Sequence, residues 1–196
     1  MERLTHLVLE TGLAGLLLAA FASTPPGPAE LPPGKAEILR HMSLVTLDDG
    51  QGGQALTVRF TGVNVQVVNG LGATNGFPAN PDSTFAPNTR TNSVGNLIVG
   101  YNEPGNPAGD VRTGSHFLVV GHGHSYRGFG GAVLGQDNTV DSVYATVTGG
   151  WENVARGARS AVSGGVLNTA TGNTASVCGG RAGLASGDIA TVGGGG

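Results

Sequence analysis

The apolar and polar positions of this chain follow a fixed period in its C-terminal part. A valine recurs every fifteen residues, and a glycine pair follows two residues after each one. The recurring residues are Val147, Gly149, Gly150, Val162, Gly164, Gly165, Val177, Gly179, Gly180 and Val192. Small and polar residues between them keep the same step, namely Asn153 and Asn168, and Ala155, Ala170 and Ala185. A short fixed period of small, β-branched and glycine residues predicts a chain wound into stacked coils.

Each coil has room for two short strands of about four or five residues, joined by turns that contain the glycine pair or asparagine. Glycine suits turn positions that need a positive φ, and asparagine tolerates the same backbone region. So thin a coil buries little apolar surface, and at roughly 25 cal/mol per Å² it offsets its own ordering entropy poorly. We therefore expect chains to associate side by side, with Ala155, Ala170 and Ala185 as the contact seam.

The region 44–144 continues the pattern less regularly. Residues 57–61 and 63–68 alternate apolar and polar side chains, which predicts two strands. Two segments, 72–93 and 103–113, are rich in Asn, Pro and Gly and predict loops inserted between coils. Loops that project from a regular scaffold commonly carry binding specificity.

Three apolar runs after the first loop end in glycine and predict irregular coils of the same solenoid. They align with the later valines at Val99, Val120 and Val133. With the regular repeats, they predict an all-β fold. This fold is a single-chain β-solenoid or β-roll of about eight short coils, preceded by a disordered or short helical N-terminal segment.

The N-terminal part reads differently from the repeats. Residues 12–21 are an apolar run followed by a small-x-small pattern, so 1–23 is either a secretory signal peptide or a short apolar helix. The run is too short to span a bilayer as a helix. Region 24–43 combines a proline-rich, extended linker with a short helix expected over 35–42. The regular repeats then occupy 145–196, where the last repeat is cut short.

Composition fits a solenoid better than a conventional core. Glycine makes up 36 of the 196 residues, aromatic residues 5% and charged residues 12%, against a usual charged share of roughly 25%. The net charge is -3, and no run of Lys or Arg gives nucleic acid an electrostatic footprint. The single cysteine, Cys178, excludes an intrachain disulfide and replaces Thr148 and Ser163 of the neighbouring repeats as a small residue.

The repeat Ser-Ala-Val-Ser-Gly-Gly-Val-Leu-Asn-Thr-Ala-Thr-Gly at 160–172 resembles the head repeats of trimeric autotransporter adhesins, the YadA-like left-handed β-roll. The resemblance covers 145–196 well and 94–144 loosely. It implies a bacterial protein that is secreted or displayed on the cell surface, three chains wound side by side, and a host matrix protein, cell-surface or glycan ligand. This sequence has no heptad stalk or C-terminal anchor barrel and stops within a repeat, so a fragment of a longer repeat protein remains an alternative.

Three histidines, His116, His122 and His124, are candidate metal ligands. His122 and His124, two residues apart in a strand, would face the same side, but zinc needs a third and usually a fourth ligand. His116 or Asp110 could supply one only if the loops brought them close. We therefore expect surface histidines and no metal site. No glycine-rich segment has the lysine of a phosphate loop or the aspartate of a calcium-binding repeat, so no cofactor is expected.

The sequence does not favour an enzyme. No serine, histidine and carboxylate set indicates a nucleophilic site, and the carboxylates are spread over the coils at Asp137, Asp141, Glu152 and Asp188. The expected function is a non-enzymatic, adhesin-like structural or binding module. The alternative is a carbohydrate-active or carbohydrate-binding β-helix, for which Trp151 and Tyr144 are the candidate sugar-stacking residues.

Overall fold

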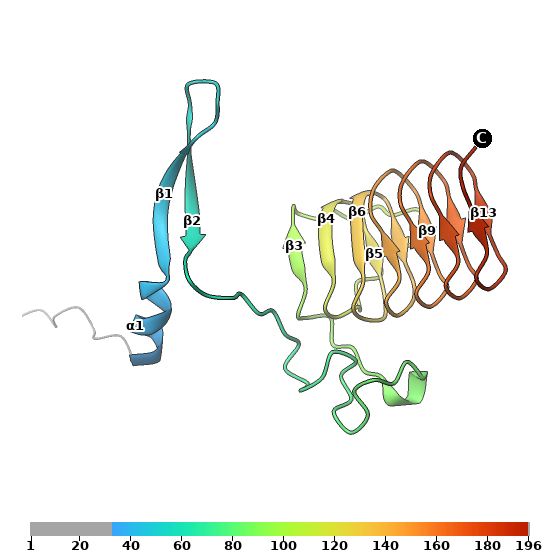
Figure 1. The fold of residues 1–196 in the computed structure, drawn as a ribbon, viewed down its shortest axis with the longest axis horizontal. Coiled ribbons are helices and arrows are strands. Elements are labelled where there is room, and N and C mark those ends of the chain that lie inside the picture. Colours follow the sequence, from blue (N-terminus) through green and yellow to red (C-terminus); the bar gives the residue numbers. More distant parts are fainter. Residues whose placement is uncertain (1–32, 196) are drawn as a thin grey trace, which may run out of the picture. The chain divides into compact units, whose positions relative to one another are not determined.

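The computed structural model describes residues 33–195 of the chain. It divides into two compact units at residues 64 and 65, and each unit is described separately (Figure 1). The signal peptide or apolar helix expected over 1–23 and most of the proline-rich linker lie outside the described residues. Within 33–195, no helix has the length and apolar character that crossing a membrane requires.

The first unit contains one short helix and a two-stranded ribbon. Its elements are α1 (Pro33–Arg40), β1 (Met42–Asp48) and β2 (Gln54–Phe60). The helix lies close to the one expected over 35–42. The two strands pair antiparallel along their whole length. Asp49 closes the turn between them, because its Oδ1 accepts the backbone N–H groups of Gln51 and Gly53 at 2.8 Å each.

This ribbon corrects the assignment of the region from residue 44 to the solenoid. The strand expected over 57–61 is present within β2, but it pairs antiparallel with β1, whereas successive coils of a solenoid pair in parallel. Residues 63–68 were expected to form another strand and have no strand pairing. Alternation of apolar and polar residues indicates an extended chain, but it carries no information on whether a neighbouring strand is available.

The second unit is a β-solenoid of parallel stacked coils (Figure 1). The larger sheet contains β3 (Leu97–Val99), β4 (Leu118–His122), β6 (Ala132–Gln136), β8 (Thr146–Val147), β10 (Ala161–Val162), β12 (Ser176–Val177) and β14 (Thr191–Val192). The smaller sheet contains β5 (Ser125–Tyr126), β7 (Thr139–Val140), β9 (Val154–Ala155), β11 (Thr169–Ala170) and β13 (Leu184–Ala185). All neighbouring strands are parallel, which confirms the predicted all-β solenoid.

The solenoid has about five turns rather than the eight expected, since the smaller sheet has five strands. The difference arises because residues 44–60 form the ribbon. The segment 72–93 is a loop, as expected, whose one regular element is the 3-10 helix η1 (Ala86–Asn88). Strands of the regular repeats are also shorter than expected, at two residues each, because the turns take up most of each repeat.

The register of the irregular coils differs from the expected one by one residue. Val99 pairs with Val120 as expected, but Val119 pairs with Val133, which in turn pairs with Val147. Neighbouring residues of a strand point to opposite faces, and Val119 is the one that is fully buried. The sequence could not distinguish these two adjacent valines, because both fit an apolar run.

The interior is a narrow column to which the larger sheet contributes valine and the smaller sheet contributes alanine. Ala155, Ala170 and Ala185 are 0–1% exposed and belong to the same apolar cluster as the valines. The expectation that these alanines form a seam between chains is therefore wrong. In β9, β11 and β13 the first side chain points outward and the second inward, so the alanines face the interior of their own coil.

Candidate functional site

The valines of the repeat stack in one column through the regular coils. Val147, Val162 and Val177 are fully buried and pair in register from coil to coil. Val192 continues the column in the last described coil and is partly buried. These residues hold the scaffold and are not accessible to a ligand.

The two glycines of each pair have different roles. The second glycine has a positive φ of 79° to 83° at Gly150, Gly165 and Gly180. A Cβ on Gly165 would overlap the carbonyl oxygen of Gly180 in the next coil. The first glycine has no such restriction, since a Cβ on Gly149 would meet nothing closer than 3.7 Å and one on Gly164 nothing within 4 Å. Only the second glycine is required by the backbone.

A ladder of buried asparagine side chains connects successive coils. Asn138, Asn153 and Asn168 are fully buried. Asn153 Nδ2 donates to the carbonyl oxygen of Gly149 in its own coil at 3.1 Å and to that of Gly165 in the next at 2.9 Å. Its Oδ1 accepts the backbone N–H of Asn168 at 2.9 Å. The asparagine ladder thus satisfies buried and part-buried backbone groups of the turn.

This ladder corrects the expected role of asparagine in the turn. The positive φ falls one residue earlier, at Glu152 (52°) and Leu167 (59°), and not at Asn153 or Asn168. The asparagines are needed for their amide groups. The sequence shows that these asparagines recur at the repeat period. A turn residue and a buried hydrogen-bonding residue would recur in the same way, so the pattern does not distinguish the two roles.

His124 occupies the ladder position in an earlier coil. Its backbone N–H donates to Asn102 Oδ1 at 2.7 Å, and its ring Nδ1 accepts the backbone N–H of Asn138 at 3.3 Å. Because Nδ1 accepts, the ring proton lies on Nε2, which donates to the carbonyl oxygen of Val120 at 3.0 Å. The side chain is fully buried, and this burial lowers the pKa of His124 below its usual value, although nearby hydrogen bonds and Asp137 partly oppose the shift.

The structure does not bring the three candidate histidines together. His122 is exposed, with Nδ1 at 3.4 Å from the carboxylate of Asp137, whereas His124 points into the interior. The expectation that these two face the same side is wrong, because Gly123 turns the chain between them with φ 66°. His116 lies elsewhere, against the segment 66–74. Among residues 33–195, no three His, Cys, Asp or Glu side chains are placed to hold a metal ion.

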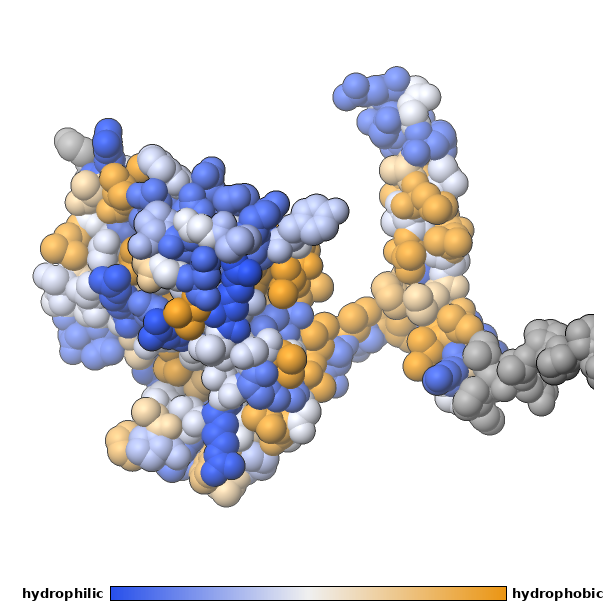
Figure 2. All heavy atoms as spheres, turned by 180° about the vertical axis from the view of Figure 1, so that it is seen from behind, coloured by the Kyte–Doolittle hydropathy of each residue, from blue (hydrophilic) through white to orange (hydrophobic). Residues whose placement is uncertain are grey.

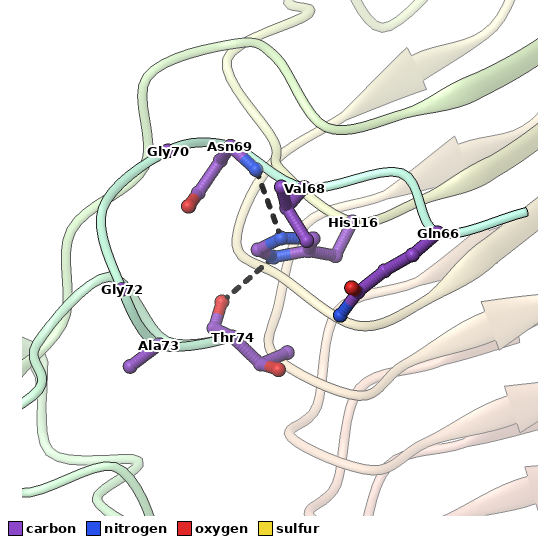
Figure 3. Close-up of a pocket in the computed structure, with 8 residues that line it drawn as sticks. All are labelled: Gln66, Val68, Asn69, Gly70, Gly72, Ala73, Thr74 and His116. Atoms are coloured by element: carbon purple, nitrogen blue, oxygen red, sulfur yellow. Dashed lines mark hydrogen bonds between the residues drawn. The ribbon is translucent and has the colours of Figure 1, made fainter. Parts of the chain in front are cut away.

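His116 forms the base of a hollow of about 470 Å³ in the second unit (Figure 3). Its Nε2 accepts the backbone N–H of Asn69 at 3.2 Å, and its Nδ1 donates to the carbonyl oxygen of Thr74 at 2.9 Å. The ring therefore fixes the start of the long loop to the solenoid. Asn69 is buried beside it, and its Nδ2 has no hydrogen-bond partner among the described residues.

The candidate aromatic residues have separate environments. Trp151 lies in the turn between the two sheets, and its Nε1–H donates to Asp137 Oδ2 at 3.3 Å. Gln136 Nε2–H donates to the same oxygen at 3.1 Å. The indole is thereby oriented while 43% of the residue remains exposed. Tyr144 instead packs edge-on against the buried ring of Phe129, with ring centroids 5.0 Å apart.

No protein-family model matches the chain, and comparisons with curated proteins and solved structures found no significant similarity. Its function is therefore inferred from its own residues.

Asp137 and Glu152 occupy equivalent positions of successive coils. Asp141 lies in the opposite turn, within 3.5 Å of Arg127 and Arg156. The carboxylates are thus distributed over both turns, and Asp137, Asp141 and Asp188 have basic or hydrogen-bonding neighbours.

The loop 103–113 borders a shallow groove of about 350 Å³ on the outer face of the smaller sheet. Asn106 anchors this loop, because its Nδ2 donates to the carbonyl oxygen of Gly123 at 2.7 Å and its Oδ1 accepts the hydroxyl of Thr139 at 3.2 Å. Pro107 of the loop forms one side of the groove, and Val154 of the sheet lines it as well. The groove gives an extended ligand a path across several coils.

The outer face of the larger sheet differs between the irregular and the regular coils. In the regular coils its outward residues are small or polar: Thr146, Thr148, Ala161, Ser163, Ser176, Cys178, Thr191 and Gly193. In the first coils it carries apolar residues, including the exposed Leu97, Val99 and Leu118. Cys178 is exposed, has no disulfide partner and fits the role of a small surface residue.

Proposed function

We propose that this chain is a non-enzymatic, adhesin-like structural and binding module, secreted or displayed on the bacterial cell surface as a homotrimer. The observation that supports the proposal is that very few residues complete the interior of each regular coil. Each one completes its interior with a valine, an alanine and, in most coils, an asparagine. Such a scaffold extends by adding coils and leaves its outward positions free to vary, which suits display better than catalysis. The resemblance to YadA-like head repeats points in the same direction.

The ligand of such a module is a host matrix protein, a cell-surface protein or a glycan. Three surface features offer binding positions on one rigid scaffold: the hollow at His116, the groove beside the loop 103–113 and the exposed indole of Trp151. Two of the three involve the inserted loops. Loops held by side chains such as Asn106 and His116 present their residues in a fixed arrangement, which lowers the entropy cost of binding.

Light scattering after size exclusion, with circular dichroism on the same sample, tests the assembly. We expect a β-rich species with the mass of three chains. Binding to immobilised matrix proteins, compared with an unrelated β-rich protein, tests the adhesive role. A folded monomer would reject the trimer, and a sample that binds none of the surfaces would reject the adhesin.

Trp151 favours one second candidate, a carbohydrate-binding solenoid. An exposed aromatic face stacks on the C–H face of a pyranose, and Gln136 and His122 lie beside it to bond hydroxyl groups. Because Trp151 is the only tryptophan, its fluorescence reports directly on this position. Titration with cello-, chito- and galacto-oligosaccharides should give a saturable change that Asp137→Asn weakens. A response that stays linear for all three series would remove this candidate.

A further inference from the structure

His116 holds the start of the long loop 72–93 against the solenoid. The segment 66–74, which leads into this loop, crosses the His116 ring (Figure 3). The Asn69 N–H donates to Nε2 of the ring at 3.2 Å, and Nδ1 donates to the carbonyl oxygen of Thr74 at 2.9 Å. Figure 2 shows the loop projecting from the coils, with hydrophilic and hydrophobic residues mixed on the face in view. The two bonds of His116 therefore fix where the loop begins.

The backbone places this ring on the outside of its coil. His116 has a φ of 57°, and Gly130 and Tyr144, which follow the equivalent turns of the next coils, have φ values of 68° and 55°. Ser115 and Phe117 on either side of His116 are buried, whereas His116 itself is only partly buried. Protons from the solvent can thus reach the ring.

The two hydrogen bonds require a neutral ring. The backbone N–H of Asn69 can only donate, and the carbonyl oxygen of Thr74 can only accept. A neutral imidazole with its proton on Nδ1 satisfies both, whereas a protonated ring carries a second N–H at Nε2, directed at the Asn69 N–H. Histidine is the side chain that gains its charge between about pH 8 and pH 5. Asn69 is only 6% exposed, so its N–H is costly to leave unpaired.

The surroundings of His116 offer no compensation for a positive charge. The ring forms no ion pair with a carboxylate of residues 33–195. None of the seven other residues that line the hollow has a titratable side chain, and neither has the segment 93–96, which packs against Asn69. On the side of the next coil lies the ring of Tyr144, against Gly130 and near Thr74, and a tyrosine phenol is uncharged in this pH range. Protonation therefore removes a hydrogen bond and gains no ion pair.

The rest of the loop has contacts that do not depend on His116. Asn92 Nδ2 donates to the carbonyl oxygen of Asn69 at 2.8 Å, and the Asn92 N–H donates to Ser115 Oγ at 3.1 Å. Asn75 Nδ2 donates to two carbonyl oxygens within the loop, at 2.8 and 3.0 Å, which preserves the loop's own shape. Loss of the His116 bonds therefore opens the segment 66–74 locally and leaves the end of the loop attached.

We infer that His116, with Asn69 and Thr74, forms a pH-dependent clamp. The clamp is closed while the ring is neutral and opens as the pH falls, which releases the start of the loop 72–93 and opens the hollow that His116 underlies. Because the hollow is one of the binding positions proposed above, the regulation of ligand binding by this clamp rests on that proposed function. The clamp itself needs no ligand.

Hydrogen–deuterium exchange of the full chain, read by peptide mass, tests the clamp without a ligand. Exchange at about pH 7.5 and about pH 5.5 is compared at equal chain concentration, after correction for the intrinsic pH dependence of amide exchange. We expect the protection of the segment 66–74 to fall by at least about tenfold at the lower pH, because the Asn69 N–H loses its acceptor. Peptides from the regular repeats 145–180, which contain no histidine, should keep their protection.

Two variants assign the response to one ring. His116→Gln offers the Asn69 N–H an amide oxygen that does not titrate, and the matched control His122→Gln removes the exposed histidine beside Asp137. The control should keep the pH response of the segment 66–74. His116→Gln should lose it, with protection retained at both pH values where glutamine reaches Asn69 and absent at both where it does not.

Equal protection of the segment 66–74 at both pH values in the wild type overturns the inference. A pH response that persists in His116→Gln, or one that extends into the regular repeats, overturns it as well. A clamp that responds as expected in a chain that binds no matrix protein rejects the proposed function alone, whereas binding without a pH response rejects the clamp alone.

Discussion

Replacing His124 with asparagine should keep the hydrogen bonds of the ladder and remove its titratable histidine. His124 holds the ladder position between Asn102 and Asn138, and its ring must stay neutral because Nδ1 accepts the Asn138 N–H. A proton added at Nδ1 would set two donors against each other in a buried site. An asparagine at this position can donate to the carbonyl oxygen of Val120 and accept from Asn138, as the later ladder residues do.

The sign and size of the pH effect follow from linkage. Burial lowers the pKa of His124 in the folded state, so the unfolded chain takes up a proton first as the pH falls. The contribution of His124 to stability is therefore complete above the unfolded pKa of about 6.5 and is lost as the pH falls from there to the folded pKa. One proton changes the free energy of unfolding by at most about 1.4 kcal/mol per pH unit. Between about pH 7.5 and pH 5.5, the loss is therefore at most about that same figure.

Urea unfolding followed by Trp151 fluorescence measures this effect at both pH values. Wild type and His124→Asn are compared at equal chain concentration, because assembly adds to apparent stability. The other histidines are common to both proteins, so their titration cancels in the difference. We expect the wild type to lose more stability than the variant on acidification, by at most about 1.4 kcal/mol. Equal losses in the two proteins, or a greater loss in the variant, would refute the neutral buried imidazole.

Three further tests of the repeat, two of them with a matched control substitution, use the urea midpoint. Gly165→Ala should destabilise the solenoid by about 2 kcal/mol or more, because Gly165 has a positive φ and a Cβ there would overlap the next coil. The control Gly164→Ala should be neutral or stabilise it by up to about 1 kcal/mol. Equal effects of the two substitutions would contradict the different roles of the two glycines. Asn168→Ala should cost about 1–3 kcal/mol, because the part-buried carbonyl of Gly164 and N–H of Gly183 lose their partner, and the exposed Asn173→Ala should cost less than about 1 kcal/mol. Gly183→Asn should extend the ladder into the last described turn and stabilise it by about 1 kcal/mol; an unchanged or lower midpoint would show that Val177 and Val192 leave no room for the side chain.

The regular part of the fold could be predicted from the sequence, because the period itself encodes the stacking. A valine that recurs at constant spacing must occupy equivalent positions of successive coils, and the structure pairs Val147 with Val162 and Val162 with Val177. The period does not state which of two small residues faces inward. Ala155 and its equivalents were therefore expected outside, although strand alternation in so short a strand turns them inward.

The irregular part was less predictable, because its signals are ambiguous in physical terms. Residues 44–60 alternate like any half-buried strand, and only the pairing partner distinguishes a hairpin from a coil. Val119 and Val120 both fit a core position until the register is known. His124 carries no sequence signal for the ladder, because a histidine directly after Gly121-His122-Gly123 resembles a surface turn more than a buried hydrogen-bonding residue.

The side chains of the asparagine ladder do not continue past the coil that contains Asn168. It runs from Asn102 through His124 to Asn168, whose Oδ1 accepts the backbone N–H of Gly183 at 2.8 Å. Gly183 has no side chain that could continue the ladder into the next coil. The turn that follows therefore lacks the amide that every regular coil before it has. In a nearest-neighbour scaffold, each coil is stabilised mainly by the two beside it, so the turn at Gly183 should open more easily than the turns that contain Asn153 and Asn168.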